Sequence, residues 1–183
     1  MVGDRFPQTL EAARTGAEWA WSSLYRDLAP SVLGYLRARD VPDAENVMGE
    51  VFLQVVRDLP EFDGGERAFR AWVFTIAHHR LIDAGRWHAR RPVELTPEPA
   101  MVVTGGPSTE DVALEQITTQ RVHGLLLQLP PDQRVVLLLR VIGRLTVEEV
   151  AHVIGKRPGA VKALQRRGLR AVQRALAKEG VPL

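Results

Sequence analysis

Residues 131–176 read PDQRVVLLLRVIGRLTVEEVAHVIGKRPGAVKALQRRGLRAVQRAL, and they decide the fold of the C-terminal third of the chain. Apolar residues such as Leu137 and Val141 follow helical spacing and predict a first helix. That helix is expected to end at Gly143, a residue that can take the left-handed conformation of a helix stop.

A second and a third helix are predicted in the rest of this stretch. Thr146 and Glu149 have the spacing of a capping box, in which each side chain satisfies a free backbone N–H of the other, and predict a short helix. Residues 155–157 form a turn, and Pro158 opens a third helix that continues to about Lys178, because a proline at a first helical position loses no hydrogen bond. Two helices joined by so short a turn are typical of a DNA-binding helix-turn-helix.

The third helix is strongly basic. From Lys156 to Lys178 the chain carries eight Lys or Arg and no Asp or Glu, so the helix repels itself unless an anion lies against it. Apolar residues fall on one side of the helical wheel, and the other side is expected to meet phosphates and base edges. The alternative is a solvated surface helix with incidental charge, although such helices usually mix both signs.

Composition limits the class of protein. The 183 residues, 45% of them hydrophobic, are enough for two small helical domains that each bury a core. The absence of Cys excludes disulfides and thiolate metal sites. No apolar signal region and no apolar run of membrane-spanning length is present, so we expect a cytoplasmic protein without membrane insertion.

The N-terminal half is expected to be helical as well. We predict a frayed start and then a helix over residues 10–29, with Trp19 among its packing residues. A second helix is expected to begin at Pro30. A third is expected over residues 43–59, where apolar residues recur every four positions and form one face. Residues 60–66, PEFDGGE, predict a loop that presents Phe62 outward.

A fourth helix is predicted from Arg67 to about Arg91. Its second half, HHRLIDAGRWHARR, interleaves basic residues with Trp87, which suits single-stranded nucleic acid, because bases stack on rings while cations follow the backbone. The alternative is a helix end charged for solubility. His79 and Asp83 share a helical face as metal ligands would, but a third ligand is missing, and a packed or DNA-facing pair of histidines is favoured.

The expected fold class is all-α: two small helical domains joined by a flexible linker rich in Pro and Gly, the C-terminal one with the helix-turn-helix. The domains are expected at residues 9–91 and 110–179, with the linker at 92–109. No phosphate loop, zinc-protease motif or nucleophile elbow occurs, so neither an enzyme nor a cofactor is expected.

Two separate stretches resemble one family. Residues 43–91 resemble region two, and residues 119–176 region four, of the extracytoplasmic-function group of bacterial sigma factors, within the sigma-70 family. The resemblance implies a promoter-specificity subunit that binds core RNA polymerase, recognises the −35 and −10 promoter elements and helps to open the promoter.

The resemblance also assigns site residues. The −35 element would be read in the major groove by Arg157, Lys162, Ala163, Arg166, Arg167 and Arg170. The single-stranded −10 element would meet the loop, which captures a flipped base, and the helix after it, through Phe62, Asp63, Gly64, His79, Arg80, Asp83, Arg86, Trp87, Arg90 and Arg91. Polymerase would be bound by Asp43, Glu50, Phe52, Gln54 and Arg57.

The chain departs from the family pattern at three of its positions. Asn46 and Gly49 stand where an acidic residue and a Gln are frequent, and His79 stands where an Asn is usual. Gly49 in mid-helix costs about 1 kcal/mol against Ala. These departures affect the promoter sequence and the polymerase contacts expected, and leave the class unchanged.

Regulation and two rival functions complete the expectations. An anti-sigma factor is expected to hold a compact arrangement that hides both DNA surfaces and to bind around Val51, Phe52, Val55 and Val56; control by synthesis alone is the alternative. An ordinary helix-turn-helix repressor or activator would bind duplex DNA tightly by itself, without needing the basic segment 80–91. A metal-dependent enzyme with an appended DNA-binding domain would show in a metal analysis.

Overall fold

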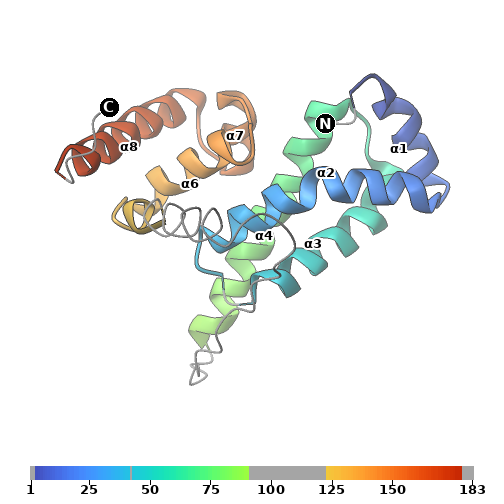
Figure 1. Cartoon of the computed structure of the whole chain (residues 1–183), viewed down its shortest axis with the longest axis horizontal. Coiled ribbons are helices and arrows are strands. Elements are labelled where there is room, and N and C mark those ends of the chain that lie inside the picture. Colours follow the sequence, from blue (N-terminus) through green and yellow to red (C-terminus); the bar gives the residue numbers. More distant parts are fainter. Residues whose placement is uncertain (1–2, 42, 91–122, 179–183) are drawn as a thin grey trace, which may run out of the picture.

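The computed structural model describes residues 3–41, 43–90 and 123–178, with the side chains of residues 86–90 excepted. All of the regular structure in these ranges is helical, as predicted (Figure 1). The elements are η1 (Gly3–Arg5), α1 (Phe6–Arg14), α2 (Glu18–Arg37), α3 (Ala44–Asp58), η2 (Leu59–Glu61), α4 (Glu66–Arg90), a turn of helix at 123–127, α6 (Pro131–Val141), α7 (Val147–Val153) and α8 (Pro158–Lys178).

Helices α1 to α4 pack around a shared apolar core. The predicted face of α3 is confirmed, because Val47, Val51 and Val55 are all buried against α2 and α4. Between α2 and α4, the rings of Tyr35 and Phe74 meet edge to face with their centroids 5.8 Å apart. The core of the N-terminal group therefore combines aliphatic side chains of α3 with an aromatic contact between α2 and α4.

The prediction of the N-terminal helices was wrong in its boundaries. The first helix ends at Arg14 because Gly16 adopts φ +84°, and the N–H of Ala17 donates to the carbonyl of Ala12 at 2.9 Å, which is a Schellman stop. Helix α2 then runs without a break through Pro30. Trp19, predicted to pack, is 60% exposed.

The C-terminal group has the predicted helix-turn-helix. The capping box of α7 is present: Glu149 N donates to Thr146 Oγ1 at 3.2 Å, and Thr146 N donates to Glu149 Oε2 at 2.6 Å. The end of α6 differs from the prediction: the left-handed residue that follows the helix is Arg144 (φ +54°), where Gly143 was expected. Gly143 serves a different need: an added Cβ would lie 2.6 Å from the carbonyl oxygen of Leu139.

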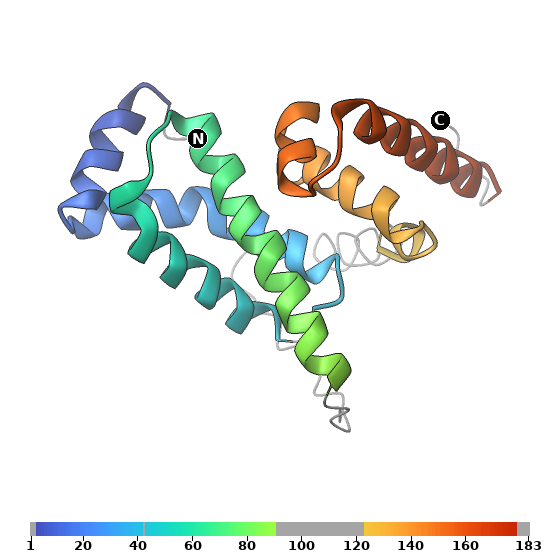
Figure 2. The same ribbon diagram turned by 180° about the vertical axis from the view of Figure 1, so that it is seen from behind.

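The two groups of helices touch each other. Helix α7 lies against α4 (Figures 1 and 2). Between the two helices, Arg67 Nη2 lies 3.5 Å from Glu149 Oε1. Just after α2, Asp40 Oδ1 lies 3.0 Å from His123 Nε2, and Asp40 Oδ2 lies 3.6 Å from Arg134 Nη1. Most of the buried apolar side chains of the described residues belong to one connected cluster that includes residues of both groups. Among the helices of the described ranges, none has the length and apolar character to cross a membrane.

Candidate nucleic-acid interface

The packed face of α8 is narrow. Val161, Leu164 and Gly168 are buried against α6 and α7. Gly168 allows a close approach to α6, since an added Cβ would lie 3.0 Å from Leu137 Cδ1. The remaining circumference of the helix carries its basic side chains, together with Leu169, which is 45% exposed.

That outer circumference is a cationic surface. It consists of the exposed side chains of Arg157, Lys162, Arg166, Arg167 and Arg170, with Ala163 half-buried among them. Helix α8 contains no acidic residue to offset this charge, whereas Lys156, in the turn before it, pairs with Asp132 at 2.9 Å. This cationic α8 surface can therefore accept an anionic partner along its length.

The loop between α3 and α4, residues 60–66, departs from the prediction. Phe62 turns back toward the core, where its ring stacks on Trp72 at a centroid distance of 4.9 Å and meets Phe69 edge to face at 5.4 Å. After Phe62, residues 63–65 form the exposed part of this α3–α4 loop, and Pro60 and Glu61 before it are exposed as well. An outward-facing Phe62 was therefore a wrong expectation: the loop offers a carboxylate and backbone groups to a ligand.

Gly64 shapes the loop. Its φ is +152°, and an added Cβ would lie 2.9 Å from the Cβ of Ala68 and 3.0 Å from the ring of Phe62. No larger residue fits there without moving the ring or the start of α4. The loop conformation is thus fixed from one side by Gly64 and from the other by the stacked rings.

The two histidines of α4 differ in environment. His78 is buried, with Nδ1 2.8 Å from the Tyr35 hydroxyl, and desolvation, followed by the nearby Arg39 and His79, lowers the pKa of His78 to about 4. Burial raises the pKa of Tyr35. His79 and Asp83 are exposed, and the described residues contain no group of three potential metal ligands. Of the pair of histidines, only His79 is available at the surface.

Arg80 links the predicted DNA-binding helix to the predicted polymerase-binding helix. Its Nε donates to Gln54 Oε1 of α3 at 3.0 Å, and its Nη1 lies 3.9 Å from Glu50 Oε2. Because Arg80 is only half-exposed, a DNA phosphate would have to compete for it with α3. Helix α4 carries Arg86, Trp87 and Arg90 in its last turns, beyond the described side chains, and Arg91 lies outside the described residues.

Three of the predicted polymerase contacts are surface side chains of α3 or its start. Glu50 and Arg57 are exposed, and Asp43 accepts a hydrogen bond from Asn46 N at 3.3 Å as the N-cap of α3. Gln54 is half-buried and bound to Arg80. Phe52 is only 9% exposed and its ring centroid lies 4.7 Å from that of Tyr25, so little of its side chain is available at the surface.

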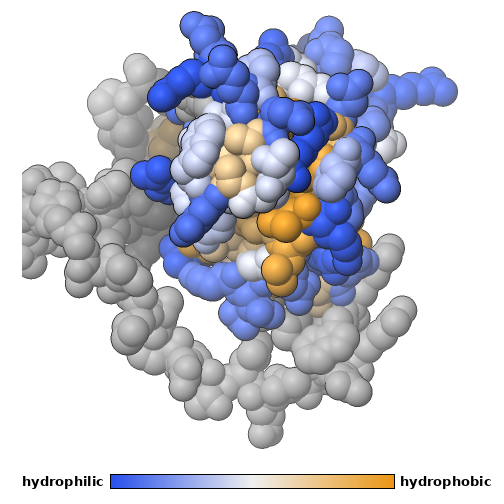
Figure 3. Space-filling model, turned by 90° about the vertical axis from the view of Figure 1, so that its right-hand side faces the viewer, coloured by the Kyte–Doolittle hydropathy of each residue, from blue (hydrophilic) through white to orange (hydrophobic). Residues whose placement is uncertain are grey.

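One apolar side chain on the outer face of α3, Leu53, was missed, whereas Val56 had been expected as a partner contact. Leu53 is 72% and Val56 49% exposed, whereas Val51 and Val55, expected as partner contacts, are in the core. Seen from the side of α1, the surface carries an apolar strip bordered by hydrophilic side chains (Figure 3). The sequence did contain a signal for this exposed apolar surface, because Leu53 falls among the polar positions of the helical wheel of α3.

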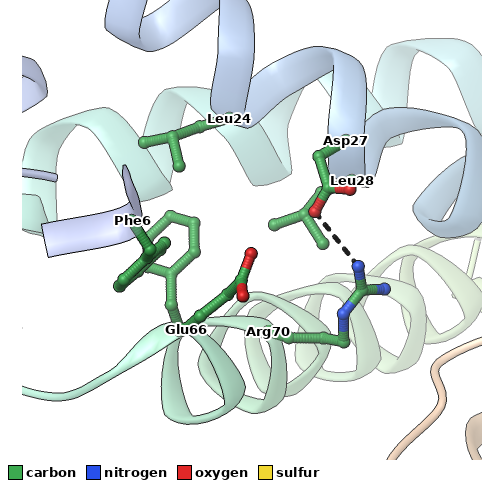
Figure 4. Close-up of a pocket in the computed structure, with 7 residues that line it drawn as sticks. Phe6, Leu24, Asp27, Leu28, Glu66 and Arg70 are labelled. Atoms are coloured by element: carbon green, nitrogen blue, oxygen red, sulfur yellow. Dashed lines mark hydrogen bonds and ion pairs between the residues drawn. The ribbon is translucent and has the colours of Figure 1, made fainter. Parts of the chain in front are cut away.

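The N-terminal segment also reaches the α3–α4 loop, which the sequence did not indicate. Arg14 donates from its guanidinium to the carbonyl of Phe62. Nearby, Arg70 and Asp27 form a largely buried ion pair at 3.1 Å beside a cavity of about 10 Å³ lined by Phe6 and Glu66 (Figure 4). The cavity has room for about one water molecule, so it is no ligand site.

A wider groove, of about 670 Å³, lies between α4 and α7. Ala71 and Trp72 line it on the α4 side, and Glu148 and His152 on the α7 side. Of the exposed residues that follow Phe62 in the α3–α4 loop, Gly65 lines this groove, whereas Asp63, Gly64 and the cationic α8 surface do not. In this arrangement of the two helical groups, the basic side chains of the cationic α8 surface and residues Asp63 and Gly64 are exposed.

Comparison with known families and proteins identifies the class. The family model for Sigma-70 region 2 matches residues 24–91, and that for Sigma-70, region 4 matches residues 119–172. The ECF RNA polymerase sigma factor SigD of Mycobacterium tuberculosis is 32% identical, over 98% of this chain and 88% of that protein. The chain belongs to the ECF RNA polymerase sigma factors. The factor ShbA of Streptomyces griseus is 35% identical to this sigma factor, over 90% of the present chain and 91% of ShbA.

Solved structures support the same fold. CnrH in complex with the cytosolic domain of CnrY matches this sigma factor with a TM-score of 0.69 and 20% identity, over 96% of this chain and 99% of that one. RpoE of Bartonella quintana, solved with the anti-sigma factor NepR, matches with a TM-score of 0.64 and 19% identity. The match covers 85% of this chain and 96% of the RpoE chain. At these identities the likeness concerns the arrangement of helices.

Proposed function

We propose that this sigma factor binds the −35 promoter element as duplex DNA through the cationic α8 surface. The observation that carries the proposal is a helix-turn-helix whose second helix exposes basic residues and contains no acid. Arg side chains read guanine in the major groove and neutralise phosphates, and the methyl group of Ala163 suits a thymine methyl. In this proposal Lys162, Arg166 and Arg167 lie closest to the bases.

We propose that the α3–α4 loop and the second half of α4 hold the single-stranded −10 element. The exposed part of the loop, with Asp63 and Gly64, is held in shape by the close packing around Gly64, and it is proposed to receive a flipped base. His79, Arg80 and Asp83 follow along α4, and Arg86, Trp87, Arg90 and Arg91 continue the basic stretch in the sequence. Phe62 contributes by supporting the loop from below.

Core RNA polymerase is proposed to bind the outer face of α3. Glu50, Gln54 and Arg57 supply its polar contacts, and Leu53 and Val56 supply an apolar centre that water would otherwise cover. Asp43 acts by capping the helix, and Phe52 acts from the core. An exposed apolar centre with a polar rim is the usual anatomy of a protein interface.

We further propose that residues 9–91 and 110–179 act as two domains joined by the linker 92–109. The chain would work in the cytoplasm as a specificity subunit, with catalysis left to polymerase.

An anti-sigma factor is proposed as its regulator, because the structural relative RpoE is solved with one. Affinity capture from the native cell tests this: recovery of polymerase subunits alone, under silent as well as active conditions, would contradict a sequestering partner.

Transcription with purified core polymerase tests the DNA assignment. Replacing Arg166 and Arg167 with Ala should cost about 1–3 kcal/mol for each good base contact, so −35-dependent transcripts should collapse while polymerase binding persists. Replacing Arg174 and Lys178 with Ala removes the same charge from the last two turns of α8 and should have a much smaller effect. An equal loss of polymerase binding in the first variant would refute the assignment.

A further inference from the structure

We propose that helix α1 is a positioning element for the α3–α4 loop, with Arg14 as its main contact. The matched Sigma-70 region 2 begins at residue 24, so α1 lies before it. The inference rests on the proposed function of the loop at the −10 element, and it assigns a role to residues outside the candidate sites.

The first support is a continuous series of aromatic contacts. Phe6, at the start of α1, is 3% exposed, and its ring centroid lies 5.6 Å from that of Phe69 in α4. Phe69 in turn meets Phe62, which stacks on Trp72. The ring beneath the loop is thus packed against a residue that α1 holds in place.

The second support is that both ends of the loop are tied to the N-terminal segment by hydrogen bonds. The guanidinium of Arg14 donates to the carbonyl of Phe62, at the beginning of the exposed part. The N–H of Gly3 donates to Glu66 Oε1 at 3.1 Å, at the end. Residues 63–65, between these two ties, are all exposed.

This geometry pre-organises the loop. A loop with both ends fixed has fewer conformations to lose when it binds a ligand, so more of its contact energy appears as affinity. Glu11 holds the guanidinium of Arg14 from the same helix at 3.2 Å, which limits the freedom of the donor. Removing Arg14 should therefore weaken capture of the −10 base without removing any group that touches DNA.

The test uses the full chain bound to core polymerase. The probes are a fork-junction promoter DNA with a single-stranded −10 non-template strand and a duplex that carries only the −35 element. Arg14→Ala should weaken binding of the fork junction about fivefold to tenfold, the loss of one hydrogen bond of ordinary net strength. Duplex binding should stay unchanged. Arg5→Ala removes an equal charge from an exposed side chain of the same segment and should change neither affinity.

Salt dependence separates positioning from direct contact. If Arg14 touched a phosphate, Arg14→Ala would reduce the slope of log affinity against log salt by about 0.7 for a single strand, and the inference would be overturned. An unchanged slope together with weaker binding supports it. Equal losses on the fork junction and the duplex would show general damage to the fold, and would overturn it as well.

Asp63→Ala distinguishes the inference from the function on which it rests. If Asp63→Ala weakens fork-junction binding and Arg14→Ala does not, the loop works without α1 and the inference fails alone. If neither change has an effect, the assignment of the loop fails. If Arg14→Ala also lowers the melting temperature, the double variant of Arg14→Ala and Asp63→Ala decides between positioning and general damage. If Arg14 positions Asp63, Arg14→Ala should reduce fork-junction affinity less when Asp63 is already Ala. Losses of affinity that simply add in the double variant would contradict the inference.

Discussion

Acid should destabilise this sigma factor through one buried side chain, His78. The imidazole lies between α4 and the Tyr35 hydroxyl, and burial holds its pKa at about 4, against about 6.5 in an unfolded chain. Below pH 6.5 the unfolded chain therefore binds more protons than the folded one. Stability is full above pH 6.5 and is lost as the pH falls toward 4.

The magnitude follows from the difference between these two pKa values. Each pKa unit corresponds to about 1.4 kcal/mol, so His78 alone should lower the free energy of unfolding by about 2.5 kcal/mol between pH 7.5 and pH 4.5. The loss is a large part of the stability of a small domain, about 5–15 kcal/mol in total.

Urea unfolding at the two pH values measures this contribution. His78→Gln removes the titration while keeping a polar side chain beside Tyr35, and should flatten the pH dependence by about 2.5 kcal/mol. The matched comparison is His79→Gln at the exposed neighbour, which should flatten the dependence much less, because His79 is the smallest of the three causes that lower the pKa of His78. If His78→Gln and wild type lost equal stability on acidification, His78 would not be the responsible group.

Three further substitutions test other parts of the structure. Gly64→Ala should destabilise the fold by about 1–3 kcal/mol in thermal unfolding, because the new Cβ would lie 2.9 Å from Ala68; an unchanged melting temperature would contradict the described loop. Leu53→Asp should weaken polymerase binding in a pull-down at unchanged melting temperature, and normal binding would place the interface elsewhere. Asp43→Ala removes the N-cap of α3 and should cost about 1 kcal/mol by urea unfolding; no change would argue that the cap is not needed.

The C-terminal helices could be predicted closely because their signals are local. The capping box at Thr146, the proline at Pro158 and the periodic apolar residues between them depend on neighbours a few positions away. The N-terminal boundaries failed for the opposite reason. Pro30 usually marks a helix start, but in α2 the burial of Leu28 and Val32 on either side of it outweighs the lost hydrogen bond.

The candidate site was predictable as a set of residue types, and less so as a set of orientations. The exposed basic side of α8 follows from its wheel, because one helix defines it. Whether Phe62 faces solvent or Trp72 depends on a residue ten positions away, and the burial of Phe52 depends on Tyr25 in another helix. The bond between Arg14 and the Phe62 carbonyl spans 48 positions and leaves no local signal.

The hydrogen bond between Arg80 and Gln54 constrains how this protein can change. A substitution at either position strands a partly buried polar group on the other helix, so the two positions should vary together among descendants of this chain. The same constraint applies to engineering. A hybrid factor that takes α4 from a donor of different promoter preference should also take α3, since the helices meet through a matched pair of side chains.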